Sequence, residues 1–315
     1  MIDKNKILHS TLLIFLFFFL GYEAFANGDL SLKKSLSAIQ KTVPLTYNTP
    51  VRKQIDAYTN YHKERFSRML GLSTYYFPIY EKILKEHGVP EELKYLSIVE
   101  SSLNPHAVSG YGAAGPWQFL NYYGKLYGLT IDDTIDERKD PALSCKAAAK
   151  YLQDSYELYG DWLVAIASYN CGRNNIKWAM EKAGGPADYW TLRPFLPVET
   201  QNYVPAYIAT VYLMNYSKKH GIYPTPPSFS VKTETLKITK SVPLETVATQ
   251  INLSLQELSL LNPAYTQLII NGTPQQPRSL VIPVLPTYTF NNLCAALGIP
   301  GRKVQTAAVP KSRYY

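Results

Sequence analysis

The sequence changes character at one place, the proline-rich run Tyr223-Pro224-Thr225-Pro226-Pro227. Before this run, apolar residues recur with helical spacing, in segments that end at glycine or proline. After it, short stretches alternate between apolar and polar residues, as half-buried strands do. A proline cluster between two periodic regions is typical of a stiff linker. The sequence therefore predicts an all-α domain over residues 51–221, a linker over 222–230 and a small α+β domain over 231–285.

The small domain has a simple predicted order of elements. Val231–Ile238 alternates like a strand, and Ser279–Val284 reads as a second strand. Between them, Leu244–Thr249 and Leu255–Leu261 have the spacing of two short helices. The expected unit is βααβ. The tail over residues 286–315 shows no strong period and is expected to be flexible.

The first domain is expected to be a series of helices with short connections. Pro141 and Gly160 bound one of them, and Asp161 is a good N-cap for the next. The expected helical segments are residues 51–70, 75–87, 91–104, 119–127, 141–159, 162–171, 174–183 and 198–220, the last with Pro205 inside it.

One acidic residue stands out within the helix that begins at Glu91. On a helical wheel, Glu100 shares a face with Leu93 and Leu96. A lone carboxylate on an apolar face costs free energy, so a fold that keeps one usually has a use for it. A loop with glycines at 110, 112 and 115 follows, and it could fold back over the end of the helix. The sequence therefore predicts a functional site around Glu100.

The N-terminus has the pattern of a secretory signal. Lys4 and Lys6 precede the apolar run Leu12–Leu20, and Ala24-Phe25-Ala26 fits a cleavage site. The run is short for a membrane span, although an uncleaved anchor is the alternative and would be the only membrane contact. We expect residues 1–26 to be a signal peptide, residues 27–50 to be disordered, and the protein to be exported to the periplasm or outer cell envelope.

Composition limits the kinds of molecule that the protein is expected to bind. The chain has 26 tyrosines and only 18% charged residues, which favours a sugar or peptide groove. Its net charge of +8 suits an anionic polymer such as cell wall, and the lack of a dense Lys/Arg run argues against nucleic acid.

Cysteine and histidine give little sign of metal chemistry. No C-x-x-C or H-E-x-x-H motif occurs, and the five histidines are scattered, so we predict no metal and no cofactor. An export compartment permits a disulfide, and Cys145 with Cys171 is the candidate pair.

Four short motifs, in order, carry a resemblance to a known family. They are Glu100-Ser101, Gly115-Pro116-Trp117-Gln118-Phe119, Ser168-Tyr169-Asn170-Cys171-Gly172 and Glu199-Thr200-Gln201-Asn202-Tyr203. Together they resemble the lysozyme-like (goose-type) catalytic domain of lytic transglycosylases, in particular the membrane-bound lytic murein transglycosylase D group. The small domain resembles a LysM glycan-binding domain through Leu258–Pro263 and Leu280–Pro283.

The resemblance implies a reaction with a single acid. In this family one glutamate, matched here by Glu100, protonates the MurNAc-β-1,4-GlcNAc oxygen of peptidoglycan. The muramoyl 6-hydroxyl then attacks its own C1, which gives a 1,6-anhydro end. Burial on an apolar helix face would raise the pKa of Glu100 and keep it protonated near neutral pH.

The resemblance also implies substrate-binding residues. Tyr203 matches the tyrosine that hydrogen-bonds the catalytic carboxyl, Ser101 is beside the acid, and Trp117 or Tyr169 would stack on a sugar face. Gln118 and Asn170 would hold acetamido groups. Asp136, Asp161 and Glu199 are at helix edges and are expected to be structural.

Two other functions fit the same sequence. A lysozyme- or chitinase-like hydrolase would need a second carboxylate across the cleft from Glu100, with room for a water. A non-catalytic wall-binding protein would use the small domain alone. A monomer is the default expectation.

Overall fold

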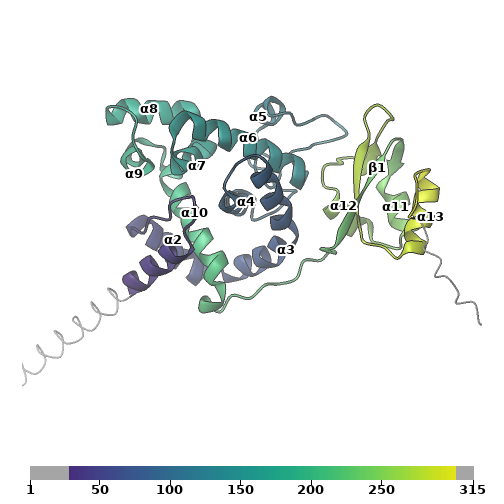
Figure 1. Ribbon diagram of the computed structural model, residues 1–315, viewed down its shortest axis with the longest axis horizontal. Coiled ribbons are helices and arrows are strands. Elements are labelled where there is room, and N and C mark those ends of the chain that lie inside the picture. Colours follow the sequence, from purple (N-terminus) through teal and green to yellow (C-terminus); the bar gives the residue numbers. More distant parts are fainter. Residues whose placement is uncertain (1–27, 303–315) are drawn as a thin grey trace, which may run out of the picture. The chain divides into compact units, whose positions relative to one another are not determined.

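The computed structural model describes residues 28–302, so the expected signal peptide at 1–26 lies outside the described residues (Figure 1). The chain forms two compact units, and two helices, α3 (Lys63–Glu86) and α6 (Pro141–Tyr159), run from one into the other. Unit 1 contains the chain up to Gly71, Tyr80–Leu103 and Ala148–Thr225; unit 2 contains Leu72–Ile79, Asn104–Ala147 and the chain from Pro226.

Every regular element that the structure describes in unit 1 is a helix. Its elements, besides parts of α3 and α6, are a helix at 28–39, α2 (Thr49–Tyr61), η1 (Glu91–Tyr95), α4 (Leu96–Ser101), α7 (Trp162–Cys171), α8 (Arg173–Ala183), α9 (Tyr189–Leu192), η2 (Arg193–Phe195), α10 (Val198–Tyr216) and η3 (Ser217–His220).

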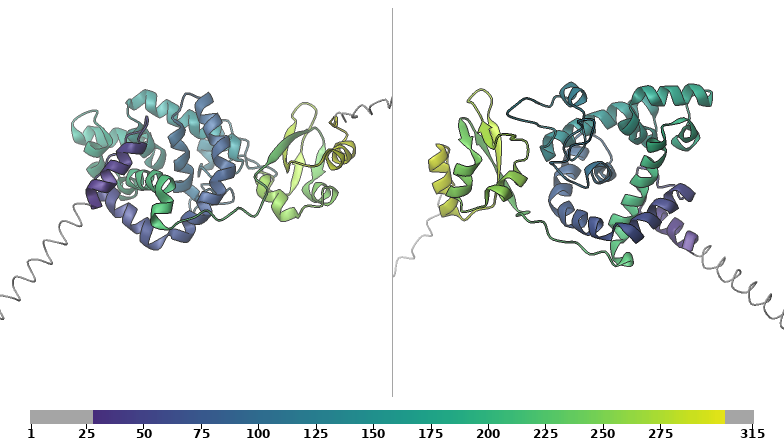
Figure 2. Two further views of the ribbon diagram at one scale, coloured as in Figure 1. Left: turned by 60° about the horizontal axis from the view of Figure 1, so that its bottom comes forward. Right: turned by 180° about the vertical axis from the view of Figure 1, so that it is seen from behind.

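Helix α10 organises this unit. It is apolar on all sides rather than on one stripe, and such helices are buried. It contacts α2, α4 and α7, and the views in Figures 1 and 2 show it running through the middle of these helices. Pro205 is inside α10, as expected, and does not end it. Residues from Tyr203 to Leu213 on this helix therefore form the core against which α4 packs.

The N-terminal segment is ordered, so the expectation of disorder over residues 27–50 was wrong. Residues 28–39 are helical, and Leu36, Val43 and Leu45 are buried. The carboxylate of Glu92 accepts backbone N–H bonds from Thr42 at 2.8 Å and from Val43 at 3.3 Å. These contacts attach the segment to η1, which carries Glu92.

Several helix bounds differ from expectation. The break after α2 falls at His62, and α3 continues through Gly71 and contains Pro78. The segment from Glu91 begins as a 3₁₀ helix and becomes α-helical at Leu96. It ends at Ser101, before the proline at 105, because Ser102 adopts a left-handed conformation with φ of 59°.

Unit 2 contains the expected βααβ order with two extra strands. Its elements are α5 (Asn121–Leu126), β1 (Thr233–Ile238), β2 (Ser241–Pro243), α11 (Leu244–Gln250), α12 (Leu255–Leu261), β3 (Ile269–Asn271), β4 (Arg278–Pro283) and α13 (Thr287–Leu297). β1 pairs antiparallel with β4, and β2 pairs antiparallel with β3.

The small domain ends in a packed helix, so the expectation of a flexible tail from residue 286 was wrong. Four side chains of α13 are buried in the core of the small domain: Phe290, Leu293, Cys294 and Leu297. Their spacing is one face of a helix. The small domain therefore extends from Thr233 to Leu297, and residues 303–315 lie outside the described part.

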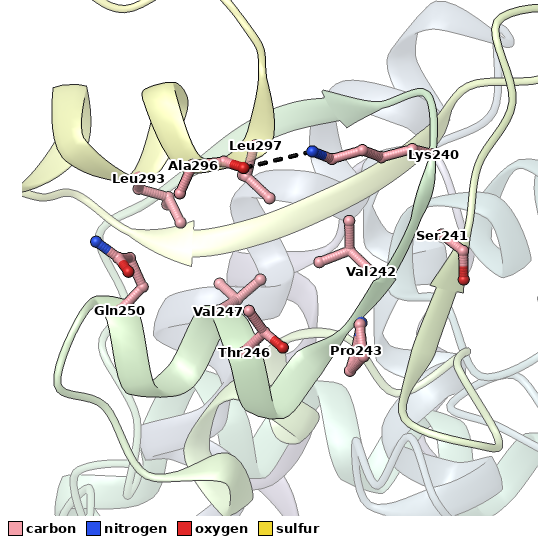
Figure 3. Close-up of a pocket in the computed structure, with 10 residues that line it drawn as sticks. All are labelled: Lys240, Ser241, Val242, Pro243, Thr246, Val247, Gln250, Leu293, Ala296 and Leu297. Carbon is pink, nitrogen blue, oxygen red and sulfur yellow. Dashed lines mark hydrogen bonds between the residues drawn. The ribbon is translucent and has the colours of Figure 1, made fainter.

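Helix α13 also closes a pocket of about 190 Å³ (Figure 3). On one side is α11, with Thr246, Val247 and Gln250, and on the other are Leu293 and Leu297. Lys240 donates to the carbonyl of Ala296 at 3.3 Å, which satisfies a carbonyl at the end of α13.

All three cysteines lie among the described residues and are free, so the candidate pair Cys145 and Cys171 does not form a disulfide. Cys145 is fully buried in α6, beside the buried residues Ala147–Ala149, and burial raises the pKa of its thiol. No helix within residues 28–302 is long and apolar enough to cross a membrane.

Candidate active site

The position of Glu100 follows from the packing of α4. Leu93, Leu96 and Ser97 are fully buried on the face that the wheel predicted, and Glu100 follows on that face, half-buried. The hydroxyl of Ser97 donates to the carbonyl of Lys94 at 2.7 Å, so this buried hydroxyl has a hydrogen-bond partner. The prediction of an inward-facing carboxylate is confirmed.

Tyr203 of α10 reaches the same carboxylate. Its hydroxyl donates a hydrogen bond to Oε1 of Glu100, and its side chain is buried. Burial, together with the negative charge of Glu100, raises the pKa of Tyr203 well above its usual value. Tyr203 therefore stays a neutral donor, and the predicted contact between this tyrosine and the acid is confirmed.

The electrostatics of Glu100 suit proton donation. Burial raises its pKa from 4.5 to about 7. The hydrogen bond from Tyr203 lowers it, and the negative charge of Glu199 raises it further. Near neutral pH the carboxyl is thus present in both forms, which is the condition under which one group can act as acid and then as base.

Helix α7, in unit 1, carries two further residues that were predicted to bind substrate, Tyr169 and Asn170. Asp161 caps it by accepting from the N–H groups of Leu163 at 2.6 Å and Val164 at 3.1 Å. Residues Trp162–Ser168 are all buried, so the helix is held on every side. Its end presents Tyr169 and Asn170, both half-buried.

Tyr169 and Asn170 are held in different ways. The ring of Tyr169 packs edge-on against Tyr151, with centroids 5.2 Å apart. Oδ1 of Asn170 accepts from the hydroxyl of Thr200 at 2.7 Å, and its Nδ2 donates to Glu199 at 3.3 Å. The end of α7 is therefore attached to the first turn of α10, four residues before Tyr203.

Glu199 is a site residue that the sequence reading missed. It was expected to be structural, yet its exposed carboxylate bonds Asn170 and acts electrostatically on Glu100. The signal was present, because residues four apart on a helix share a face and Glu199 is four positions before Tyr203.

Ser101 makes a local contact. Its hydroxyl donates to the carbonyl of Ser97 at 3.2 Å, within its own helix. The next residue, Ser102, accepts from Arg65 at 2.7 Å. Ser102 and Leu103 both have left-handed backbone, with φ of 59° and 64°, which is uncommon outside glycine. This turn directly after the Glu100 helix is held by the complete burial of Leu103.

Trp117 and Gln118 belong to unit 2, in the glycine loop (residues 110–119). Trp117 is fully buried, so the expectation that it stacks on a sugar is wrong; its ring is part of the core. Gln118 is half-buried with φ of 51°. Its Nε2 donates to the carbonyls of Gly115 at 2.8 Å and Ala107 at 3.3 Å, so part of its amide is used to hold the loop.

Gly115 cannot be replaced without moving the backbone. Its φ is 82°, and a Cβ there would lie 1.8 Å from the carbonyl oxygen of Arg138. Among residues 28–302 there is no group of three or more His, Cys, Asp or Glu side chains that could hold a metal ion.

Two parts of the chain match known protein families. Residues 77–190 match the family described as "Transglycosylase SLT domain". Residues 232–298 match the family described as "Lytic transglycosylase MltD, LysM-like domain". The first match contains Glu100, the glycine loop and Asn170, and the second includes α13.

Individual proteins are similar to parts of the chain. The chain is 34% identical over 183 residues to membrane-bound lytic murein transglycosylase D of Escherichia coli K12, which is 57% of this chain and 40% of that protein. It is 31% identical over 87 residues to the transglycosylase of Enterobacteria phage PRD1, 28% of this chain and 31% of that protein. The 70 kDa soluble lytic transglycosylase of Escherichia coli matches with a TM-score of 0.40 at 17% identity, over 57% of this chain and 33% of that one.

The chain therefore has two classified parts, and the expected fold class, a lysozyme-like helical domain with a small α+β domain, is confirmed. The helical part contains the region that is similar to transglycosylase SLT domains, and the small domain is similar to the LysM-like domain of lytic transglycosylase MltD. The chain spans about 40% of the length of the murein transglycosylase D that it matches.

Proposed function

We propose that the protein is a peptidoglycan lytic transglycosylase in which Glu100 is the single acid and base. The observation that supports this most directly is a carboxyl with a pKa of about 7 that accepts a hydrogen bond from Tyr203. The SLT match and the murein transglycosylase D relative support the substrate class.

The proposed reaction has two proton transfers. The Glu100 carboxyl donates its proton to the glycosidic oxygen between MurNAc C1 and GlcNAc O4, and the C1–O4 bond breaks. The 6-hydroxyl of the same muramoyl residue then bonds to C1 and gives its proton to the Glu100 carboxylate. The products are a 1,6-anhydromuramoyl end and a free GlcNAc 4-hydroxyl, and the acid is restored.

Tyr203 has a defined part in this cycle. Its hydroxyl donates to the carboxyl oxygen, and such a bond is stronger when the acceptor is charged. The bond therefore stabilises Glu100 just after the proton has left. Tyr203 also fixes the orientation of the carboxyl from a buried position on α10.

The residues proposed to contact glycan are those predicted site residues whose side chains are partly exposed. Tyr169 keeps a partly exposed ring for a sugar face, and Asn170 and Gln118 keep free hydrogen-bonding capacity on their amides. Ser101 remains a candidate contact beside the acid. Trp117 is not part of the proposed groove. The small domain would bind glycan, and the membrane-bound murein enzyme among the relatives favours a place in the cell envelope.

The activity is tested with a matched pair of Glu→Gln variants. Glu100→Gln should reduce the release of soluble muropeptides from purified sacculi by roughly 10²- to 10⁴-fold, the usual worth of a general acid. Glu181→Gln, an exposed position on α8, should leave release unchanged. Retained activity in Glu100→Gln would reject the assignment.

One observation favours a hydrolase as the second candidate. A hydrolase needs a second carboxylate, and Glu199 acts electrostatically on Glu100. If Glu199 were base or nucleophile, Glu199→Gln should lose roughly 10²- to 10⁴-fold in kcat. If the muramoyl hydroxyl is the nucleophile, the same variant should keep most of its kcat and change only its pH profile.

A further inference from the structure

Unit 2 contains a clasp between the SLT domain and the small domain. The clasp consists of residues 133–137 on one side and residues 264–267 with Arg278 on the other. Ile135 forms an antiparallel β-bridge with Tyr265. The N–H of Asp136 donates to the carbonyl of Ala264 at 2.8 Å, and the N–H of Thr266 donates to the carbonyl of Thr134 at 3.2 Å.

Side chains close the clasp on both sides of the bridge. Ile135 is buried in the apolar core of the small domain, although it belongs to the SLT match. Glu137 accepts from Arg278 at 3.0 Å, and both side chains are largely buried. The other carboxylate oxygen of Glu137 accepts from the N–H of Thr130 at 2.7 Å. A buried, bonded ion pair of this kind is far more sensitive to loss of one partner than a surface pair.

Arg138, the residue after the clasp, holds the glycine loop. Its Nε and Nη2 donate to the two carboxylate oxygens of Asp136 at 2.9 and 2.8 Å. Its Nη1 donates to the carbonyls of Gly112 at 2.8 Å and Phe119 at 3.1 Å. The side chain is buried, and its own carbonyl lies against Gly115.

The clasp and the glycine loop therefore share one short support. The backbone N–H of Asp136 donates to the small domain, and the side chain of Asp136 accepts from Arg138. Arg138 in turn bonds the backbone at both sides of the loop that carries Gln118. Besides the burial of Trp117, these hydrogen bonds fix the loop backbone, so the loop responds to small shifts of the guanidinium group that donates them.

The geometry points to Arg138 and Arg278 as positioning residues: the small domain, docked through the clasp, holds the glycine loop in its binding shape. The small domain is then a structural part of the substrate site as well as a glycan-binding module. This inference rests on the proposed function for its kinetic consequence, but its structural consequence can be measured without any substrate.

The test uses the full chain with Arg278→Gln, its conservative counterpart Arg278→Lys, and Arg302→Gln as the matched control. Arg302 also makes an ion pair within unit 2, with Glu234, and its guanidinium donates to Glu234 and to the carbonyl of Leu285, which are outside the clasp. Arg278→Gln removes the charge opposite Glu137, Arg278→Lys keeps it, and Arg302→Gln removes a charge elsewhere.

The first readout is hydrogen exchange of the glycine-loop amides. The N–H groups of Ala114 and Gly115, which bond the carbonyls of Phe119 and Ala107, should exchange roughly three- to tenfold faster in Arg278→Gln, the effect of losing about one hydrogen bond. Arg278→Lys should restore most of the protection, and Arg302→Gln should match the unmodified protein. Unchanged loop exchange in Arg278→Gln would overturn the inference.

The second readout is a separation of KM from kcat on sacculi. Arg278→Gln should raise KM by roughly three- to tenfold and leave kcat within about twofold. The reason is that the glycine loop contributes to glycan binding, whereas Glu100 transfers the protons of the reaction. A uniform fall in kcat with normal loop exchange would contradict the inference. If the unmodified protein released no muropeptides, the proposed function would fail, while the exchange result would still decide on the positioning role.

If Arg278→Gln does not fold, Arg138→Lys provides a second route. Lysine has a single point charge and cannot reproduce the guanidinium bonds to Asp136 and to two carbonyls. Loop exchange should rise in this variant while amides in β1 and β4 keep their protection. Equal exchange of loop and strands would indicate general destabilisation and reject a specific role for Arg138.

Discussion

At the scale of single residues, the site depends on a balance at Glu100. An acid that donates a proton near neutral pH needs a raised pKa, and Glu100 has one because the packing of α4 partly shields its carboxyl from water. Shielding alone would also make the ionised form costly after the proton leaves, and Tyr203 offsets that cost through its hydrogen bond. Glu199 acts in the opposite direction, because a like charge favours the protonated acid.

The two neighbours of Glu100 should shift its pKa in opposite directions. Tyr203→Phe removes a bond that lowers the pKa, so the pKa should rise above about 7. Glu199→Gln removes a charge that raises it, so the pKa should fall. The measurement is the alkaline limb of kcat/KM against pH, which should move up in the first variant and down in the second. Shifts of the same sign in both variants would contradict the electrostatic account.

Glu100 should also make stability depend on pH. Its folded-state pKa of about 7 lies above its ordinary value of 4.5, so between these values the native protein binds more protons than the unfolded chain. Stability therefore falls as pH rises through this window. Glutamine does not ionise, so Glu100→Gln does not lose stability in this window. The free energy of unfolding of Glu100→Gln minus that of the unmodified protein should therefore rise by roughly 1–3 kcal/mol from pH 4.5 to pH 8. Urea unfolding at both pH values measures this, and a pH-independent difference would contradict it.

At the residue scale, helical spacing predicted the inward face of Glu100, and the family resemblance predicted its contact with Tyr203. Trp117 was misassigned because residue type does not tell whether a ring faces solvent or core. Glu199 was missed because its position at the start of α10 favoured a structural role, although it shares a helix face with Tyr203.

At the scale of elements, the site is supported by helices whose ends are well defined. Helix α7 carries Tyr169 and Asn170, and its buried start is fixed by Asp161. Its bounds were predictable because a cap, an apolar run and a glycine mark them. The strands β2 and β3 were not, since each has only three residues and shows no usable period.

The Asp161 cap should be measurable as stability. Asp161→Ala leaves the N–H groups of Leu163 and Val164 without the carboxylate and should lower the free energy of unfolding by about 1–2 kcal/mol. Asp161→Asn keeps a capping oxygen and should lose less. Urea unfolding of both variants measures the difference. Equal losses in the two variants would indicate that the charge, rather than the cap bonds, matters.

At the scale of the whole molecule, the sequence predicted a helical domain and a small α+β domain on the two sides of the proline run. Unit 2 joins residues 72–79 and 104–147 to residues 226–302, so it contains parts of both predicted domains. The clasp between them in unit 2 could not be predicted, because Ile135 and Tyr265 are far apart in sequence and their bridge leaves no local pattern. The last helix was missed for a related reason. The polar face of α13 has no charged residue, so its helical period is weak.

Helix α13 should contribute to the stability of the small domain. Leu293→Ala removes a buried side chain and should cost about 2–5 kcal/mol. Tyr288→Ala, at an exposed position on the same helix, should have little effect. Hydrogen exchange of the β1 and β4 amides reports on this domain alone. Similar exchange in the two variants would mean that α13 is not part of the folded core.

The most direct test of the proposed chemistry is the identity of the new chain ends. Purified sacculi are digested in water enriched in ¹⁸O, and the muropeptides are analysed by mass spectrometry. We expect 1,6-anhydromuramoyl ends without ¹⁸O from the unmodified protein, and roughly 10²- to 10⁴-fold fewer such ends from Glu100→Gln. Reducing ends that carry ¹⁸O would show that water is the nucleophile and would contradict the proposed chemistry.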